Sequence, residues 1–161
     1  MNSLQAPAAV VMIRPHNFCS NPDTQVDNAF QITAGDPETT RKKALQEFDT
    51  AVETLRNASV RVHVFDDTGT TTPDSVFPNN WFSTHSGGHI AIYPMHAPNR
   101  RLERRWDVIE ALKRSYRVQD VIDFSGLEED GLALEGTGAM VLDHVGRVAY
   151  TVKSNRADPV L

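Results

Sequence analysis

The side chains best suited to chemistry in this chain lie close together in residues 77–85, which read FPNNWFSTH. Asn79 brings amide donors and acceptors, and His85 brings an imidazole that can orient, protonate or hydrogen-bond a planar substrate group. Taken singly, Asn79 is typical of a turn, and His85 is typical of a strand-end histidine whose hydrogen bonds are satisfied. Together, at the start of an expected strand, they indicate the mouth of a binding site.

Two arginine-containing motifs follow, RRLE at 100–103 and SNR at 154–156. An arginine in the first helical turn after a strand can hold a carboxylate through two parallel hydrogen bonds, which singles out Arg100 or Arg101. The alternative is a solvated, charged helix face. Arg156 lies just past an expected strand end, where anion binding competes with a simple salt bridge. These arginines are the candidates for binding a substrate anion.

Glu135 is the best candidate for a catalytic carboxylate. It precedes Gly136 and Gly138, which let backbone approach closely on both sides and favour a cationic or hydrogen-bond-donating group. A turn glutamate is the alternative reading. We expect the four motifs to converge on one pocket, because each stands at the edge of an apolar strand or helix pattern, where functional side chains are commonly mounted.

Alternating helix and strand patterns must position these motifs. The apolar run at 8–13 predicts a buried strand, and Asp36 with Pro37 begins a helix that continues to Leu55 after a long polar loop at 16–35. The later elements are a strand at 60–65, a hairpin at 82–86 and 90–93, a helix with Leu102, Trp106, Ile109, Leu112 and Tyr116 on its apolar face, a strand at 118–124, and a hairpin at 139–142 and 147–152. This order predicts the α/β or α+β class.

Composition narrows the functional classes. The 161 residues fit one domain, and a formal charge of −5 argues against nucleic acid as a partner. A single cysteine, Cys19, excludes an internal disulfide framework. The sequence shows no leader, and no apolar run reaches the ~20 residues that a membrane span needs. The cytoplasm is therefore the expected compartment. His85, His89 and His96 do not have metal-ligand spacing, since a glycine turn separates the first two. We expect no metal and no cofactor.

In this order, the motifs resemble the guanidino-group modifying superfamily, which includes arginine deiminases, dimethylarginine hydrolases and amidinotransferases. The likeness is nearest to the bacterial amidinotransferase-like branch that hydrolyses citrulline. The residues that carry it are MIRP at 12–15, the 77–85 motif, YPM at 93–95 with NRRLERR at 99–105, EGTG at 135–138 and SNR at 154–156.

The resemblance implies a five-bladed α/β propeller (the pentein-like fold) with a polar central site, a covalent adduct on a cysteine, and a histidine as general acid and base. Carried over by position, Asn79 contacts the substrate. Glu135 holds the substrate or orients the catalytic histidine, and Arg101 (or Arg100) with Arg156 grips the substrate α-carboxylate. His85 stands where deiminases have an aspartate, and a neutral imidazole suits an uncharged ureido group, which favours citrulline over arginine.

The family's catalytic histidine and cysteine lie in the later half of its fold, and Cys19 is not that cysteine. Residues 1–161 are therefore expected to be the N-terminal half of an amidinotransferase-like propeller, with about half of the blades and no separate second domain. The expected function is that of a hydrolase fragment acting on C–N bonds of an arginine- or citrulline-like amino acid, inactive by itself. The alternatives are a non-catalytic amino-acid-binding module and an inactive truncated remnant. An unfinished module would leave strand edges exposed, through which homo-oligomers could form.

Overall fold

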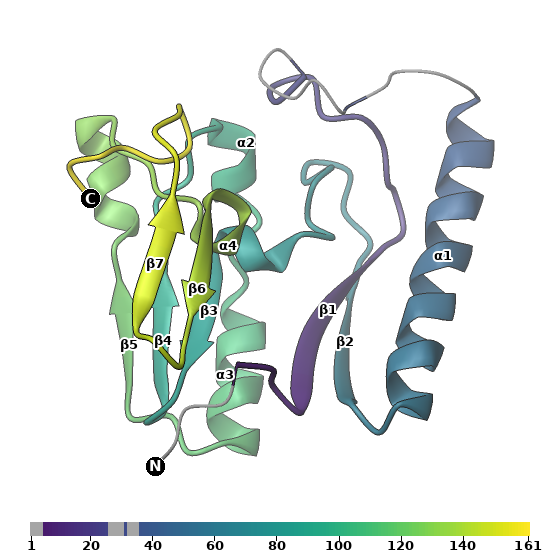
Figure 1. The fold of residues 1–161 in the computed structure, drawn as a ribbon. Coiled ribbons are helices and arrows are strands. Elements are labelled where there is room, and N and C mark those ends of the chain that lie inside the picture. Colours follow the sequence, from purple (N-terminus) through teal and green to yellow (C-terminus); the bar gives the residue numbers. More distant parts are fainter. Residues whose placement is uncertain (1–4, 26–30, 32–35) are drawn as a thin grey trace. The chain divides into compact units, whose positions relative to one another are not determined.

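The computed structural model describes residues 5–25, 31 and 36–161 (Figure 1). The predicted loop at 16–35 therefore lies partly outside the described residues. The chain divides into two compact units, Pro7–Pro78 and Asn79–Leu161 with Met1–Ala6, and each is described by itself. Both mix helices with short strands, as the sequence predicts.

The first unit is a strand, a helix and a strand. Strand β1 (Ala9–Pro15) pairs in parallel with β2 (Arg61–Asp67), and helix α1 (Pro37–Asn57) connects them and runs alongside both (Figure 1). The side chain of Asp36 accepts a hydrogen bond from Thr39 N at 2.9 Å, which caps the first turn of α1 and confirms the predicted helix start. The parallel pairing needs such a crossover, because a tight turn cannot join parallel strands.

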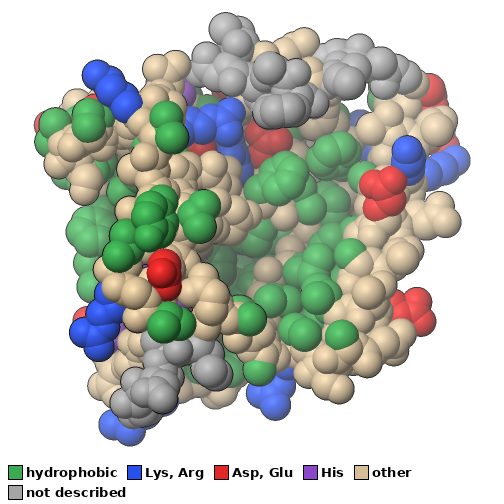
Figure 2. Space-filling view, in the orientation of Figure 1, with side chains coloured by type: hydrophobic (Ala, Val, Ile, Leu, Met, Phe, Trp, Pro, Cys, Tyr) green, Lys and Arg blue, Asp and Glu red, His purple; other side chains and the backbone are tan. Residues whose placement is uncertain are grey.

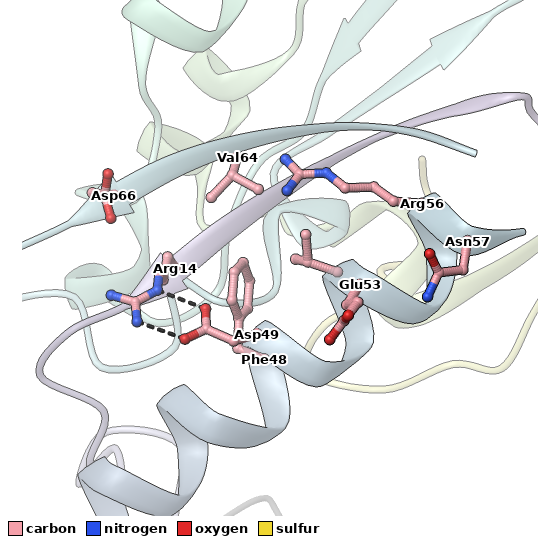
Figure 3. A pocket seen from close by; sticks show the side chains of 9 residues that line it. Arg14, Phe48, Asp49, Glu53, Arg56, Asn57, Val64 and Asp66 are labelled. Atoms are coloured by element: carbon pink, nitrogen blue, oxygen red, sulfur yellow. Dashed lines mark hydrogen bonds and ion pairs between the residues drawn. The ribbon is translucent and has the colours of Figure 1, made fainter. Parts of the chain in front are cut away.

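The core of this unit lies between α1 and the sheet. Phe48 and Val52 of α1 pack with Val62 of β2, and partly buried valines, leucine and methionine surround them. A cavity of about 670 Å³ opens beside this core, with Arg14 and Asp49 joined by two hydrogen bonds at one end (Figure 3). Its lining contains none of the six side chains that the sequence predicts for the site.

The second unit contains a three-stranded sheet and a hairpin. Strand β3 (Phe82–His85) is antiparallel to β4 (His89–Ile92), which in turn is parallel to β5 (Asp120–Asp123). Gly87 and Gly88 form the predicted turn with φ of +95° and +87°, values that glycine adopts readily. The predicted final hairpin is β6 (Met140–Asp143) with β7 (Val148–Thr151). The helical elements are η1 (Pro78–Asn80), α2 (Pro98–Arg101), α3 (Trp106–Ser115), η2 (Ser125–Asp130) and α4 (Gly136–Ala139).

The single helix expected from Arg100 to Tyr116 is wrong in its continuity. α2 ends at Arg101 and α3 begins at Trp106, so Leu102 and Trp106 stay 63% and 58% exposed. Val108, Ile109 and Leu112 form the buried face instead. The break lies at Arg105, whose backbone is extended (φ −120°, ψ 107°), and the neighbouring Arg104 bonds Glu128.

Charges of both signs are interspersed on the face of the molecule that Figure 2 shows. Among the described residues, no helix combines the length and apolarity that crossing a bilayer requires. The same residues hold no group of three or more His, Cys, Asp or Glu side chains suited to a metal ion.

Candidate functional site

Two of the sequence motifs touch where η1 meets the start of α4. Gly136 has a φ of +39°, and a Cβ there would lie 3.0 Å from Asn80 O and well inside contact distance of Asn79 O. A Cβ on Gly138 would run into the side chain of Asn80. Thr137 Oγ1 donates to Asn79 O at 3.5 Å. The two glycines therefore let the 77–85 and 135–138 motifs approach backbone to backbone.

A buried charge network lies under this contact. Arg100 is 2% exposed and donates from Nε and Nη2 to the two carboxylate oxygens of Glu103, each at 2.9 Å. The amide oxygen of Asn80 accepts from Nη1 and Nη2 of Arg100, the latter at 3.1 Å. A buried ion pair offsets its desolvation only with such paired geometry. Arg100 is therefore fixed in place by groups on both sides.

Glu135 sits at the centre of the cluster. Its side chain is 1% exposed, and Oε1 accepts from His96 N at 3.0 Å. Oε2 lies 3.6 Å from Arg100 Nη1 and 3.9 Å from Arg156 Nε, yet no hydrogen bond to this oxygen is formed by the described residues. Buried carboxylate oxygens nearly always have a hydrogen-bond donor. Oε2 is thus positioned to accept a hydrogen bond from a ligand.

The SNR motif reaches the same place through the backbone. Glu135 N donates to Arg156 O at 2.9 Å, and an isolated antiparallel bridge joins Leu134 to Ala157. The Arg156 side chain keeps 25% of its surface exposed. Its guanidinium therefore combines proximity to Glu135 with access from outside.

Arg101 faces a different partner. Its Nε donates to Met95 O at 3.0 Å and its Nη2 to His96 O at 3.3 Å, while Nε lies 3.5 Å from Glu128 Oε2. The side chain is 33% exposed. Arg101 thus holds the loop whose His96 N–H bonds Glu135.

His85 lies at the far end of β3, which runs away from α4 (Figure 1). Its Nε2 is 2.7 Å from Ser83 Oγ, which is also 2.7 Å from the Tyr93 hydroxyl. The ring stands 5.7 Å from that of His144. Burial, and then the charges of His144 and His89, lower the pKa of His85, so the ring is neutral at pH 7. The role of His85 in the site stays a prediction.

Asn80, Glu103 and Glu128 are the members of the network that the sequence does not single out. Glu103 carries a usable signal, because a carboxylate three residues after an arginine faces it on a helical turn. Asn80 and Glu128 carry none. Asn80 differs from Asn79 only by one position, and Glu128 is one of several carboxylates in an acidic loop.

The depressed pKa of His85 predicts a pH dependence of stability. The unfolded chain binds a proton more readily, so stability is fully present above pH 6.5, the ordinary pKa, and falls as the pH drops toward the lower folded value. His85→Asn should weaken this loss between pH 7 and pH 5, measured by urea unfolding. The exposed His96, changed to Asn, serves as the control. An unaltered pH profile in the His85 variant would contradict the prediction.

Comparison with known proteins gives a family and a fold. The model of the N,N-dimethylarginine dimethylhydrolase family, eukaryotic, matches residues 14–161. No curated protein matches the chain significantly. The solved structures that are similar to it include three with 16–20% identity, which shows the fold alone.

The first is the N-terminal domain of ArgZ, an arginine dihydrolase from the ornithine-ammonia cycle in cyanobacteria, solved as a cysteine-to-serine variant bound to substrate. It has 16% identity and a TM-score of 0.66, with 94% of this chain and 51% of that chain covered. The second is a dimethylarginine dimethylaminohydrolase adduct with S-methyl-L-thiocitrulline, with 20% identity and a TM-score of 0.62, and the match covers 92% of this chain and 52% of that chain. The third is AgrE with ornithine and NAD+, with 18% identity and a TM-score of 0.67, and the match covers 94% of this chain and 20% of that chain. The chain thus spans about half of the first two and 21% of the chain in the apo structure of ArgZ.

Proposed function

This chain belongs to the N,N-dimethylarginine dimethylhydrolase family of guanidino-group hydrolases, and we propose that it is the substrate-holding, N-terminal half of such an enzyme. The substrate is an arginine- or citrulline-like amino acid, and the reaction splits a C–N bond of its guanidino or ureido group. The coverage of about half of the matched chains supports a partial five-bladed propeller. The meeting of four separated motifs around Glu135 supports a site within these residues.

The proposal depends on one observation: Glu135 Oε2 is buried and accepts no hydrogen bond from the described residues. A buried carboxylate oxygen without a donor is costly, so it is expected to be satisfied when the site is filled. The N–H groups of a guanidino or ureido carbon supply donors of the right kind. The family's catalytic histidine, oriented by this carboxylate, is the other candidate donor. Asn79, exposed beside Gly136, is positioned to contact the same substrate group.

The arginines divide into two roles. The guanidinium of Arg100 is buried and bonded to both oxygens of Glu103, so we assign it to holding Glu135 in place. The side chains of Arg101 and Arg156 are 33% and 25% exposed, and we propose that they bind the α-carboxylate of the substrate. Arginine suits that role because its planar fork matches a carboxylate bidentately.

The nucleophile is proposed to come from outside these 161 residues. In the expected reaction, a cysteine thiolate adds to the guanidino or ureido carbon, and an amine or ammonia leaves with a proton from the histidine. Water then releases the product from the sulfur. Cys19 lies in the other unit from Glu135 and is not assigned this role. The purified chain should release no ammonia or ornithine from citrulline, and clear release would overturn this part of the proposal.

Calorimetry of the chain with citrulline and with arginine at millimolar concentration tests substrate binding. We expect Arg156→Ala to weaken binding about tenfold or more, because a charge-assisted hydrogen bond contributes about 1.5–3 kcal/mol. Citrulline should bind more tightly than arginine if His85 faces the ureido group. The matched control is Arg105→Ala, since Arg105 pairs with the exposed Asp107 instead of the cluster.

Each result has a distinct reading. No heat from a folded chain at millimolar ligand would favour a truncated remnant without a ligand. Binding that Arg156→Ala leaves intact would remove Arg156 from the site. Binding of citrulline weakened in the Arg156 variant, and unchanged in the Arg105 variant, is the expected outcome.

A further inference from the structure

The cavity in the first unit combines an apolar floor with charged side chains at its rim (Figure 3). Its lining comes from α1, β2 and the end of β1. Phe48 and Val52 of α1 form the floor together with Val64 of β2, and the first two are 7% and 6% exposed. Ligand pockets commonly have this composition, an apolar lining with a few polar groups that orient the bound molecule. The volume of about 670 Å³ is also in the usual range for small-molecule sites.

The polar groups that α1 contributes form a row along one face of the helix. Asp49, Glu53 and Arg56 follow one another at spacings of four and three residues, which places them on the same face, and Asn57 ends the row. At a rise of about 1.5 Å per residue, the row from Asp49 to Arg56 spans about 10 Å. The helix therefore presents two carboxylates and then a guanidinium along the length of an extended small molecule.

At the Asp49 end of the row, the charges are held by neighbours. Arg14 donates to both carboxylate oxygens of Asp49, from Nε at 2.8 Å and from Nη2 at 2.7 Å. These hydrogen bonds lower the pKa of Asp49, so its carboxyl group is ionised at neutral pH. Asp66 Oδ1 lies 2.7 Å from His16 Nε2. A carboxylate can accept about four hydrogen bonds, so this end keeps capacity for a cationic group of a ligand.

At the Arg56 end, the polar side chains have weaker partners. Arg56 Nη2 donates to Val62 O at 3.5 Å, which is long for such a bond. Glu53 and Asn57 are exposed, and the side chain of neither forms a hydrogen bond or ion pair with the described part of the chain. Figure 3 shows Arg56 reaching from α1 toward Val64, with the Arg14–Asp49 pair at the opposite end. A guanidinium and a carboxylate so placed match the two charges of a zwitterion.

The charge balance of the lining selects the kind of zwitterion. Three carboxylates face two guanidinium groups, which leaves an excess of one negative charge. An α-amino acid whose side chain ends in a cation carries the complementary excess of one positive charge. Its aliphatic stem can lie on the apolar floor while its charged groups stay at the rim, as lysine and arginine stems do on protein surfaces.

We propose that this cavity binds a free cationic α-amino acid, with its α-carboxylate on Arg56, its α-ammonium on Glu53 and its side-chain cation at the Asp49 end. Every residue of this site belongs to the first unit, whereas Glu135 and Arg156 belong to the second. The site is therefore independent of the proposed function. A ligand that contacts both α1 and β2 also stabilises the first unit by mass action.

Nuclear magnetic resonance titration of the chain tests the site, with the methyl groups of Val52 and Val64 as reporters. The probes are L-lysine, L-norleucine, which lacks the side-chain cation, and cadaverine, which lacks the carboxylate. We expect lysine to shift both valine signals saturably. Norleucine and cadaverine should each bind at least about fivefold more weakly, because each loses one charged contact. Citrulline has no net charge and should not shift the two valines, so its calorimetry reports on the site around Glu135 alone.

Two substitutions in the row test the assigned contacts. Glu53→Gln and Arg56→Gln should each weaken lysine binding about fivefold or more, because each removes one charge at the rim. The matched control is Lys43→Gln, since Lys43 is an exposed residue of α1 that pairs with Glu47 and does not line the cavity. It should leave lysine binding unchanged.

Three results would overturn the proposal. The first is a folded chain in which lysine at tens of millimolar leaves the signals of Val52 and Val64 unshifted. The second is norleucine binding as tightly as lysine, which would mean that the charges at the rim do not select the ligand. The third is lysine binding that both Glu53→Gln and Arg56→Gln leave intact. All three variants change exposed side chains, and retained dispersion of the methyl signals shows that each is folded.

Discussion

Arg100→Met is expected to lower the free energy of unfolding by about 3–5 kcal/mol, because removing one partner leaves buried charges without compensation. The guanidinium bonds both oxygens of Glu103 and lies 3.6 Å from Glu135. All three side chains are at most 3% exposed. Methionine replaces much of the volume and removes the charge, so the loss reports electrostatics more than packing. Urea unfolding at pH 7 measures it.

The matched control is Arg105→Met. Arg105 also bonds a carboxylate through Nε and Nη2, but its partner Asp107 is 57% exposed. Exposed pairs contribute at most about 1 kcal/mol. The double change Arg100→Met with Glu103→Leu should regain part of the loss, since it removes the stranded carboxylate together with its partner. An Arg100 effect no larger than that of Arg105 would show that the network does not hold the site.

The fold was largely predictable because its elements begin and end with local signals. Asp36 and Pro37 start α1, and Gly87 with Gly88 closes the β3–β4 hairpin, all through short-range backbone chemistry. The helix expected at 100–116 failed where the chain makes a long-range contact. The spacing of Leu102 and Trp106 fits a helix, but the backbone is extended at Arg105, next to Arg104, which bonds Glu128 24 residues along the chain.

In the site, too, local sequence signals predict some features and only tertiary packing decides others. The motifs that meet at Glu135 can be found in the sequence as polar residues beside glycines and strand ends. Which of two neighbours points inward cannot be found there. Arg100 is buried and Arg101 is partly exposed, and Asn80 is buried while Asn79 is exposed. In a helical turn one residue step rotates a side chain by about 100°, so only tertiary packing decides between them.

Gly136→Ala should destabilise the chain by about 2–5 kcal/mol. Overpacking costs about 1–3 kcal/mol, and a left-handed backbone adds about 1–2 kcal/mol for a residue with a Cβ. The new methyl group would run into the backbone of Asn79, which cannot rotate away as a side chain can. Two control substitutions, Gly131→Ala and Gly126→Ala, separate these causes in thermal or urea unfolding. Gly131 has a φ of +73° in open space, so its substitution isolates the cost of the backbone dihedral, and Gly126 lacks both constraints.

Gly138 extends the test from stability to the contact between motifs. Its added methyl group would meet the Asn80 side chain, with Cγ only 2.6 Å away. Gly138→Ala should therefore cost about 1–3 kcal/mol in the wild type and much less in an Asn80→Ala background. Gly136→Ala should show no such rescue, because its obstacle is backbone. Equal costs of Gly138→Ala in both backgrounds would mean that Asn80 does not lie against α4, and the assembly of the site around Glu135 would lose its support.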